Sequence, residues 1–217
     1  MANQTFNKLT GTRYMVFLSV MAAILLLLGL VPNMGYIRLA VLSVTIIHIP
    51  VIIGAVLLDC KAGAILGFLF GLTSMITATF INPNPIESPL FSPFYTVGEF
   101  QGGWKSVLLC FVPRILVGIV AWVVSRALLK TKMPKSLSLG ITGVVASLTN
   151  TILVLGGIYV LFRIPYAAAY GIALDSLFGV LGGVVLTNGL AEAAVAGILT
   201  AAIGSALMVV MRKLTSK

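Results

Sequence analysis

The sequence predicts an all-α integral membrane protein, a bundle of six transmembrane helices with both termini in the cytoplasm. Composition is the first observation behind this prediction: of 217 residues, 59% are hydrophobic and only 9% are charged, against about 25% charged residues in an ordinary soluble domain. The second is a set of six long apolar stretches, and the third is the uneven distribution of lysine and arginine between them. Together these observations exclude a soluble enzyme.

Each apolar stretch is close to the ~20 residues that a helix needs to cross a bilayer. The predicted spans are residues 14–31, 42–58, 62–81, 107–129, 137–161 and 187–211. With short loops they occupy the whole chain, so we expect one domain, 1–217, and no separate aqueous domain. The basic residues before the first stretch resemble a signal peptide, but its length and the lack of a small-x-small cleavage site favour a retained helix.

The basic residues set the orientation. With a cytoplasmic N-terminus, three of them (Arg38, Lys105 and Arg163) lie in outer segments and ten lie in inner segments, an excess typical of cytoplasmic loops. The inner set is Lys8, Arg13, Lys61, Arg126, Lys130, Lys132, Lys135, Arg212, Lys213 and Lys217. The apolar segment 165–186 is predicted to form a re-entrant or surface helix, because a seventh span would place the C-terminal basic residues outside.

Small residues at every fourth position predict where helices pack closely, since lipid supplies no hydrophobic force between helices. Such a ladder occupies Gly63, Gly67 and Gly71 in the third span, and a longer one runs from Gly189 to Ser205 in the sixth. General bundle packing explains both ladders more simply than a moving seam does.

The chain lacks the sequence motifs of an ATPase and of an intramembrane serine protease. No Gly-x-x-x-x-Gly-Lys-Ser/Thr loop is present to bind ATP phosphates. An intramembrane protease with His48 as base and Ser74 or Ser43 as nucleophile would have no Gly-x-Ser-x-Gly motif to support it. A stand-alone secondary transporter stays open, with Glu192 as the one embedded acid that would couple transport to an ion gradient.

We expect no disulfide, metal or cofactor. Cys60 and Cys110 lie in separate hydrophobic regions, and a single histidine cannot complete a zinc site. On a soluble protein the net charge of +9 would suggest a nucleic-acid partner. Here the charge follows the membrane orientation, so we expect no nucleic-acid partner.

Arg114 is the most informative residue, because it lies about seven residues inside the predicted fourth span, roughly 10 Å deep. A permanent charge there costs about 2.5–3.5 kcal/mol, so the guanidinium should face a polar interior. Pro113 should free a backbone carbonyl beside it. Two interpretations stay open: an internal ion pair with Glu192 or Glu99, and a clamp for an anionic substrate group, since guanidinium binds carboxylates through two hydrogen bonds.

Other polar residues are predicted at a similar depth. His48 is near the outer end of the second span, Asn150 and Thr151 lie in the outer half of the fifth, and Asn188 and Glu192 begin the sixth. Together with Arg114 they predict one polar pocket that opens outward and is closed toward the cytoplasm by apolar helix ends.

The outer loop at about 82–104 is predicted to cover that pocket as a lid. Prolines stiffen it, and it presents aromatic rings that include Phe91 and Phe94. At about 20 residues it is longer than the 2–8 residues of ordinary helix connections, and such length is usually functional or disordered. An amphipathic loop resting on lipid headgroups is the alternative. The shorter outer loop 32–38 would meet the lid from the other side.

Several strings of the sequence resemble the substrate-binding S components of energy-coupling factor (ECF) vitamin importers, small six-helix membrane proteins with both termini inside. They are IHIPVIIGA at 47–55, AGAILG at 62–67, FGLTS at 70–74, FSPF at 91–94 and PRILVG at 113–118. The similarity covers about a third of the chain, and elsewhere it is limited to size, topology and hydropathy. Within this family the sequence is most similar to the pantothenate-specific members.

The resemblance implies that this chain binds the substrate and that partner proteins supply the energy. An S component captures a vitamin outside the cell, associates with a transmembrane scaffold protein and two cytoplasmic ATPases, and topples in the membrane to release the vitamin inside. The partners would then hydrolyse ATP, and this chain would not be an enzyme. The resemblance also implies that it is located in a bacterial plasma membrane. Family members dock on the scaffold through Ala-x-x-x-Ala in the first helix; the matching positions here are Ser19 and Ala23, with serine replacing the first alanine.

Substrate chemistry adds to the resemblance. Pantothenate carries one carboxylate, one amide and two hydroxyls, which suits one buried arginine among amide, histidine and hydroxyl groups. Riboflavin would favour a wider aromatic cavity, and a thiamin-like cation would need an acid in place of the arginine. The candidate substrate contacts are Arg114, Asn150, His48, Asn188, Phe91, Phe94, Ser92 and Gln101. An S component for riboflavin, hydroxymethylpyrimidine or folate, a secondary transporter and a purely structural subunit stay open.

Overall fold

The described part of the chain is mainly helical, and five of its helices are long and apolar enough to cross a membrane. The computed structural model describes residues 11–215 except 33, 40–41, 86 and 99. The five are α1 (Thr12–Leu30), α3 (Cys60–Ile76) with the π-helix η1 (Thr77–Ile81), α5 (Trp104–Leu128), α6 (Lys135–Tyr170), and the continuous run of α7 (Leu174–Val184), the π-helix η2 (Val185–Gly189) and α8 (Leu190–Thr215).

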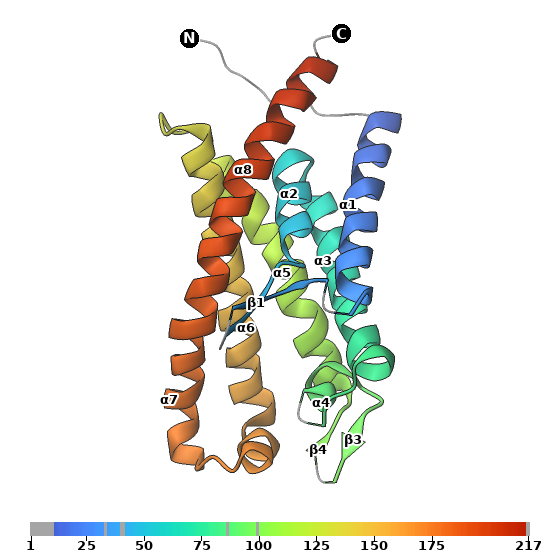
Figure 1. The fold of residues 1–217 in the computed structure, drawn as a ribbon, viewed down its shortest axis with the longest axis vertical. Coiled ribbons are helices and arrows are strands. Elements are labelled where there is room, and N and C mark those ends of the chain that lie inside the picture. The colour runs from blue at the N-terminus through green and yellow to red at the C-terminus, as the bar shows by residue number, and fades with distance from the viewer. Residues whose placement is uncertain (1–10, 33, 40–41, 86, 99, 216–217) are drawn as a thin grey trace.

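The long helices run along the long axis of the molecule (Figure 1). The start of α1 and the end of α8 lie at one end of the bundle, here called the terminal end. The opposite end, here called the loop end, carries the short helix α4 (Ser88–Phe91) and the hairpin of β3 (Thr96–Val97) and β4 (Phe100–Gln101). Three predicted spans, at 14–31, 62–81 and 107–129, therefore agree with α1, α3 plus η1, and α5.

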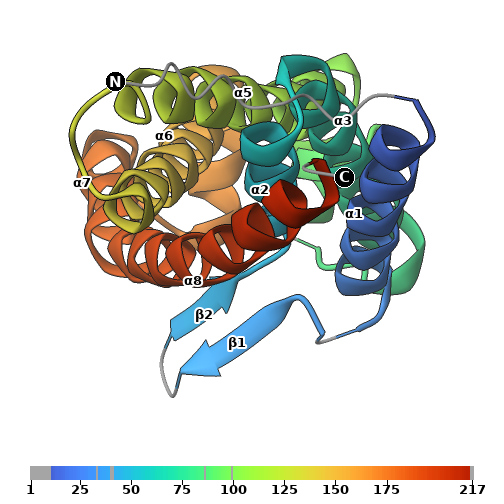
Figure 2. The same ribbon diagram turned by 90° about the horizontal axis from the view of Figure 1, so that it is seen from above.

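The predicted span at 42–58 is wrong as a continuous helix. The strands β1 (Tyr36–Leu39) and β2 (Leu42–Thr45) pair antiparallel, and only Ile49–Leu57 form a helix, α2. Figure 2 shows α2 enclosed by other helices, while the hairpin extends beyond them. All residues of α2 are buried, and a buried helix is apolar on every side. Its composition therefore matches that of a membrane span, although Pro50 in its first turn marks where the helix begins.

The last two predicted spans are shorter than the helices that the structure contains. α6 continues past Pro165 to Tyr170, and α7 begins at Leu174. Between them Gly171 adopts a left-handed conformation with φ 64°, which ends α6 and allows the chain to reverse. The segment 165–186 thus lengthens two long helices, and its prediction as a re-entrant or surface helix is wrong.

The connection of Leu58 and Asp59 between α2 and α3 is hydrogen-bonded to three helices near the terminal end. The Asp59 carboxylate accepts a hydrogen bond from the Ala62 amide at 2.8 Å, which caps α3, and another from the Tyr14 hydroxyl of α1 at 3.1 Å. Arg126 of α5 donates to the neighbouring Leu58 carbonyl at 3.2 Å. These bonds fix the short connection between α2 and α3, so α2 is held in the centre of the bundle.

Glycines allow the helices around the site to pack with close backbone contact. A Cβ atom on Gly67 would overlap with the Arg114 carbonyl oxygen and lie 2.8 Å from Ile115 Cα. In the other ladder, a Cβ atom on Gly197 of α8 would lie 3.2 Å from the Gly140 carbonyl oxygen of α6. Both predicted ladders therefore lie at helix interfaces, and the one on α3 fixes the α5 backbone at Arg114.

Replacing Gly67 with leucine should destabilise the protein by roughly 1–3 kcal/mol, the usual cost of overpacking, because α5 leaves no room for a side chain. The matched control is Gly156→Leu, since a Cβ atom at that position meets nothing within 4 Å. Thermal unfolding in detergent measures both variants, and only Gly67→Leu should melt earlier than the parent. Equal melting temperatures for the two variants would contradict the close α3–α5 packing.

Candidate functional site

The guanidinium of Arg114 is held by its own helix. Arg114 lies ten residues after α5 begins, about 15 Å along it, and is only 6% exposed. Because Pro113 has no N–H, the Leu109 carbonyl lacks its usual helical partner. Arg114 Nη1 donates to that carbonyl at 2.9 Å. The prediction that the proline frees a carbonyl beside the guanidinium is confirmed.

Two aromatic rings flank the same guanidinium. Arg114 Cζ lies 5.5 Å from the ring centroid of Phe70 on α3 and 4.7 Å from that of Phe91 on α4. Such cation–π contacts orient a guanidinium without cancelling its charge. The positive charge is therefore positioned on a helix and presented to the space beside it.

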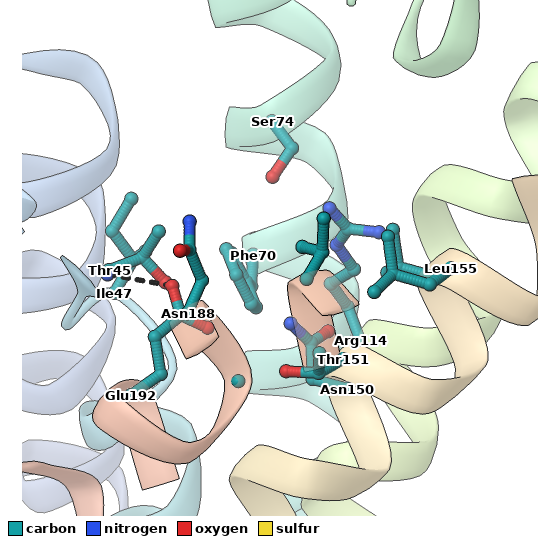
Figure 3. A pocket seen from close by; sticks show the side chains of 13 residues that line it. Thr45, Ile47, Phe70, Ser74, Arg114, Asn150, Thr151, Leu155, Asn188 and Glu192 are labelled. Atoms are coloured by element: carbon teal, nitrogen blue, oxygen red, sulfur yellow. Dashed lines mark hydrogen bonds between the residues drawn. The ribbon is translucent and has the colours of Figure 1, made fainter. Parts of the chain in front are cut away.

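That space is a cavity of about 220 Å³, here called the main chamber. In Figure 3, Arg114 and Asn150 lie on one side of it, and Thr45, Asn188 and Glu192 lie on the other. The lining residues are Thr45, Ile47, Phe70, Ser74, Arg114, Asn150, Thr151, Val154, Leu155, Val184, Asn188, Gly189 and Glu192. The chamber thus combines one guanidinium, one carboxylate, two amides and three hydroxyl-bearing residues with apolar side chains.

Irregular backbone places the polar groups opposite Arg114. Asn188 belongs to the π-helix η2, and Glu192 follows four residues later in α8, so both face the same side. The amide of Thr45, at the end of β2, donates to Glu192 Oε1 at 2.9 Å, which holds the carboxylate toward the chamber wall. Asn150 Oδ1 on α6 is buried and has no hydrogen-bond partner among the described residues. A buried amide oxygen of this kind is suited to accept a hydrogen bond from a ligand.

A smaller cavity of about 110 Å³, here called the loop-end chamber, adjoins the main chamber. Ile47, Ser74 and Arg114 line both. The other residues of the loop-end chamber are Gly29, Thr73, Thr77, Ala78, Asn82, Asn84, Glu87, Ser88 and Phe91. Both cavities therefore border the Arg114 side chain.

The predicted lid packs onto the loop end of the bundle. Leu90 and Phe100 of the lid form one buried cluster with Leu109 of α5 and Phe162 of α6. The Ser106 hydroxyl of α5 donates to a lid carbonyl, that of Pro89, at 2.6 Å. α4 thereby places Phe91 against Arg114. In this structure the segment 82–104 is thus a wall of the site.

Some of the predicted site residues come together and others do not. Arg114, Asn150 and Asn188 all line the main chamber, and Phe91 lines the loop-end chamber. His48 precedes α2, is 1% exposed, and lines neither chamber. Neither of its ring nitrogens has a hydrogen-bond partner within the described residues. His48 is also absent from the cavity that Ser74 lines, so the arrangement gives no support to a His–Ser protease.

Ser92, Phe94 and Gln101 also line neither chamber. Ser92 is fully buried, and its hydroxyl accepts hydrogen bonds from Thr79 Oγ1 at 2.8 Å and from the Phe94 amide at 3.3 Å. Phe94 itself is 77% exposed. Gln101 is exposed and pairs with Thr96 in the β3–β4 hairpin. Ser92 therefore stabilises the lid from within, and Phe94 and Gln101 lie on its surface.

The structure adds chamber residues that the sequence interpretation did not assign to the substrate. Thr45, the last residue of β2, and Ile47, in the β2–α2 connection, belong to a segment that the sequence placed inside a membrane helix. Phe70 and Ser74 are four residues apart on α3, and this spacing on one helix face was the available signal. Of the two predicted ion-pair partners for Arg114, Glu192 lines the main chamber with it, and Glu99 lies outside the described residues.

Ser19 and Ala23 lie on the exposed face of α1. Only Met21 and Leu25 are buried in this helix, and both small residues are exposed in the structure. Their spacing of four residues places them one above the other on that face. Ser19 and Ala23 therefore form a strip of small exposed side chains, beside larger exposed ones such as Val20.

Comparison with known proteins assigns the architecture to a family. The model of the family described as "ECF transporter, substrate-specific component" matches residues 13–204. The Pantothenic acid transporter PanT of Lactococcus lactis subsp. cremoris is 39% identical over 165 residues, covering 75% of this chain and 76% of that protein. The Pantothenate transporter PanT of Leuconostoc mesenteroides subsp. mesenteroides is 34% identical over 203 residues, covering 91% of this chain and 93% of that protein.

The family match extends from the start of α1 into α8 and includes every residue that lines the two chambers. Together with the long apolar helices, it identifies a multi-pass membrane protein that serves transport and is not an enzyme. The chain therefore belongs to the family of substrate-specific components of ECF transporters.

Proposed function

We propose that this chain is the pantothenate-binding subunit of an ECF-type importer and that the vitamin binds in the main chamber. The observation that carries the proposal is the buried guanidinium of Arg114, presented to a chamber lined by amide and hydroxyl groups. Two relatives that cover most of this chain are named as pantothenate transporters, which supports the choice of vitamin.

The chemistry of pantothenate matches the chamber group by group. Its carboxylate bonds to Arg114, because a charge-assisted pair in a buried site is stronger than a neutral hydrogen bond. Its amide and two hydroxyls bond to Asn150 and Asn188, and Glu192 accepts from a hydroxyl. Its geminal methyl groups pack against apolar side chains such as Leu155. No neutral vitamin precursor would use the guanidinium in this way.

We place the loop end of the bundle outside the cell. The excess of lysine and arginine in the segments near the terminal end supports this orientation. The buried helix α2 and the segment before it, where Thr45 and Ile47 line the main chamber, then make the second of six crossings. Irregular backbone is tolerated in a membrane where it lines a cavity. Both termini lie in the cytoplasm.

Energy for import comes from partner proteins in this proposal. The chain carries no ATP-binding loop of the Gly-x-x-x-x-Gly-Lys-Ser/Thr type. A transmembrane scaffold and two cytoplasmic ATPases supply the energy, and the scaffold docks against Ser19 and Ala23. Small exposed residues four apart on α1 allow the close helix approach that such docking needs.

Replacing Arg114 with alanine should weaken pantothenate binding between about tenfold and 150-fold, which corresponds to the roughly 1.5–3 kcal/mol of a charge-assisted hydrogen bond. Isothermal titration of detergent-purified protein measures the affinity, and circular dichroism checks that the variant is folded. Arg163→Ala is the matched control, since it removes an exposed arginine that lines neither chamber. Unchanged affinity in folded Arg114→Ala would remove this residue from the site.

The same titration against a panel of B vitamins tests the substrate. Submicromolar binding of pantothenate, with weaker binding of riboflavin, folate and hydroxymethylpyrimidine, is expected. Tight binding of another vitamin would keep the family mechanism and refute pantothenate. Absence of binding to every compound would refute the vitamin-binding proposal and favour a structural subunit.

Leucine at Ser19 or Ala23 should leave pantothenate binding unchanged but abolish uptake by the complete importer, because the larger side chain separates α1 from the scaffold. Uptake is measured in liposomes that contain the chain with its scaffold and ATPases. Ala202→Leu serves as control, since it enlarges an exposed alanine on α8. Normal uptake by the Ser19 and Ala23 variants would contradict docking at this strip, and uptake by the chain alone would indicate a secondary transporter.

A further inference from the structure

The loop-end chamber has no role in the binding mode proposed above, although it shares Ile47, Ser74 and Arg114 with the main chamber. Both cavities therefore border the same three side chains, and the guanidinium of Arg114 is one of the groups between them. The remaining lining residues of the loop-end chamber come from the end of α1, from Thr73 of α3, from η1 and from the lid. The chamber therefore lies between the loop end of the molecule and the guanidinium.

Polar groups line this chamber from the molecular surface inward. Asn82, Asn84 and Glu87 are exposed at the loop end. Ser74, farther in, is half-buried, and Arg114 is 6% exposed. A ligand with hydroxyl, amide and carboxylate groups thus meets hydrogen-bonding partners over the whole distance. In the main chamber the corresponding polar partners are Asn150, Asn188 and Glu192.

The positive charge of Arg114 acts on both cavities. The flanking ring of Phe91 lines the loop-end chamber, and that of Phe70 lines the main chamber, with the guanidinium 4.7 Å and 5.5 Å from their centroids. A carboxylate therefore stays beside the same cation while it passes from one cavity to the other. Low-dielectric walls concentrate the field of such a charge along a narrow opening.

Hydrogen bonds fix parts of the lining of the loop-end chamber. Thr77 Oγ1 of η1 donates to the Gly29 carbonyl of α1 at 2.9 Å. In the lid, the Asn84 amide donates to Ser88 Oγ at 2.7 Å. Ala78 of η1 also lines the chamber and contributes only a methyl group. A larger group at this position would fill much of a cavity of about 110 Å³.

We infer that the loop-end chamber is an antechamber through which pantothenate, or another carboxylate-bearing ligand of similar size, enters and leaves the main chamber past Arg114. The inference rests on the proposed function and adds the path by which the ligand reaches its binding site. The antechamber holds the ligand only in passage, so its residues set the rates of binding and release. The affinity depends on the main chamber.

The test places a removable plug in the antechamber. Ala78→Cys is purified in the folded state and then modified with a bulky methanethiosulfonate reagent, which a reductant removes again. Ile81→Cys is the matched control, because Ile81 belongs to the same π-helix, is 36% exposed and lines neither chamber. Treatment of the unchanged chain controls for Cys60 and Cys110. Binding and release of radiolabelled pantothenate are followed over time in detergent.

Modified Ala78→Cys should bind and release pantothenate at least tenfold more slowly, with an affinity within threefold of the parent, because a plug in a passage slows both directions equally. Reductant should restore both rates, and modified Ile81→Cys should match the parent. An unchanged association rate in fully modified Ala78→Cys would overturn the antechamber and favour entry beside β2. Faster release at an unchanged association rate would also overturn it. That result would mean that the modification weakens binding, so the chamber would be part of the binding site itself.

Failure of the inference is distinguishable from failure of the proposed function. If the unmodified parent chain binds no pantothenate, both are overturned. If the parent binds pantothenate and the modified Ala78→Cys chain keeps the parent rates, only the antechamber is overturned.

Discussion

The buried guanidinium of Arg114 is the constraint on which the rest of the site depends. A permanent charge inside an apolar bundle is stable only if several groups hold it and a polar space receives it. Here Pro113 exposes the Leu109 carbonyl, α3 and the lid supply aromatic faces, and Gly67 allows α3 to approach the α5 backbone at this point. The helix packing, the lid and the chamber thus converge on one side chain.

Regular helix is interrupted at three places around that charge. The π-helix η1 lines the loop-end chamber, η2 lines the main chamber, and α2 begins only at Ile49, after a hairpin. Single π-helical turns frequently occur at functional sites. Within a membrane, irregular backbone is tolerated where it is buried in protein or lines a cavity. Its location around the two chambers agrees with both rules.

The sequence correctly predicted that Arg114, Asn150 and Asn188 line one pocket. The prediction was possible because the rise per residue of a helix gives each residue a depth in the membrane. Composition could not reveal α2, since a helix buried in protein and one buried in lipid are equally apolar. Nor could it orient the lid, where side chains within a few residues diverge: Phe91 contacts the guanidinium while Phe94 is exposed. Those directions are set by tertiary packing.

The most direct test of the account compares pantothenate with its alcohol analogue, in which a hydroxymethyl group replaces the carboxylate, on the parent chain and on Arg114→Lys. Lysine keeps the positive charge but cannot form the bidentate hydrogen bonds that a guanidinium makes with a carboxylate. If Arg114 binds the carboxylate, titration should show strong preference for pantothenate in the parent and a preference at least fivefold smaller in the variant. Equal preference in both proteins would contradict the central claim.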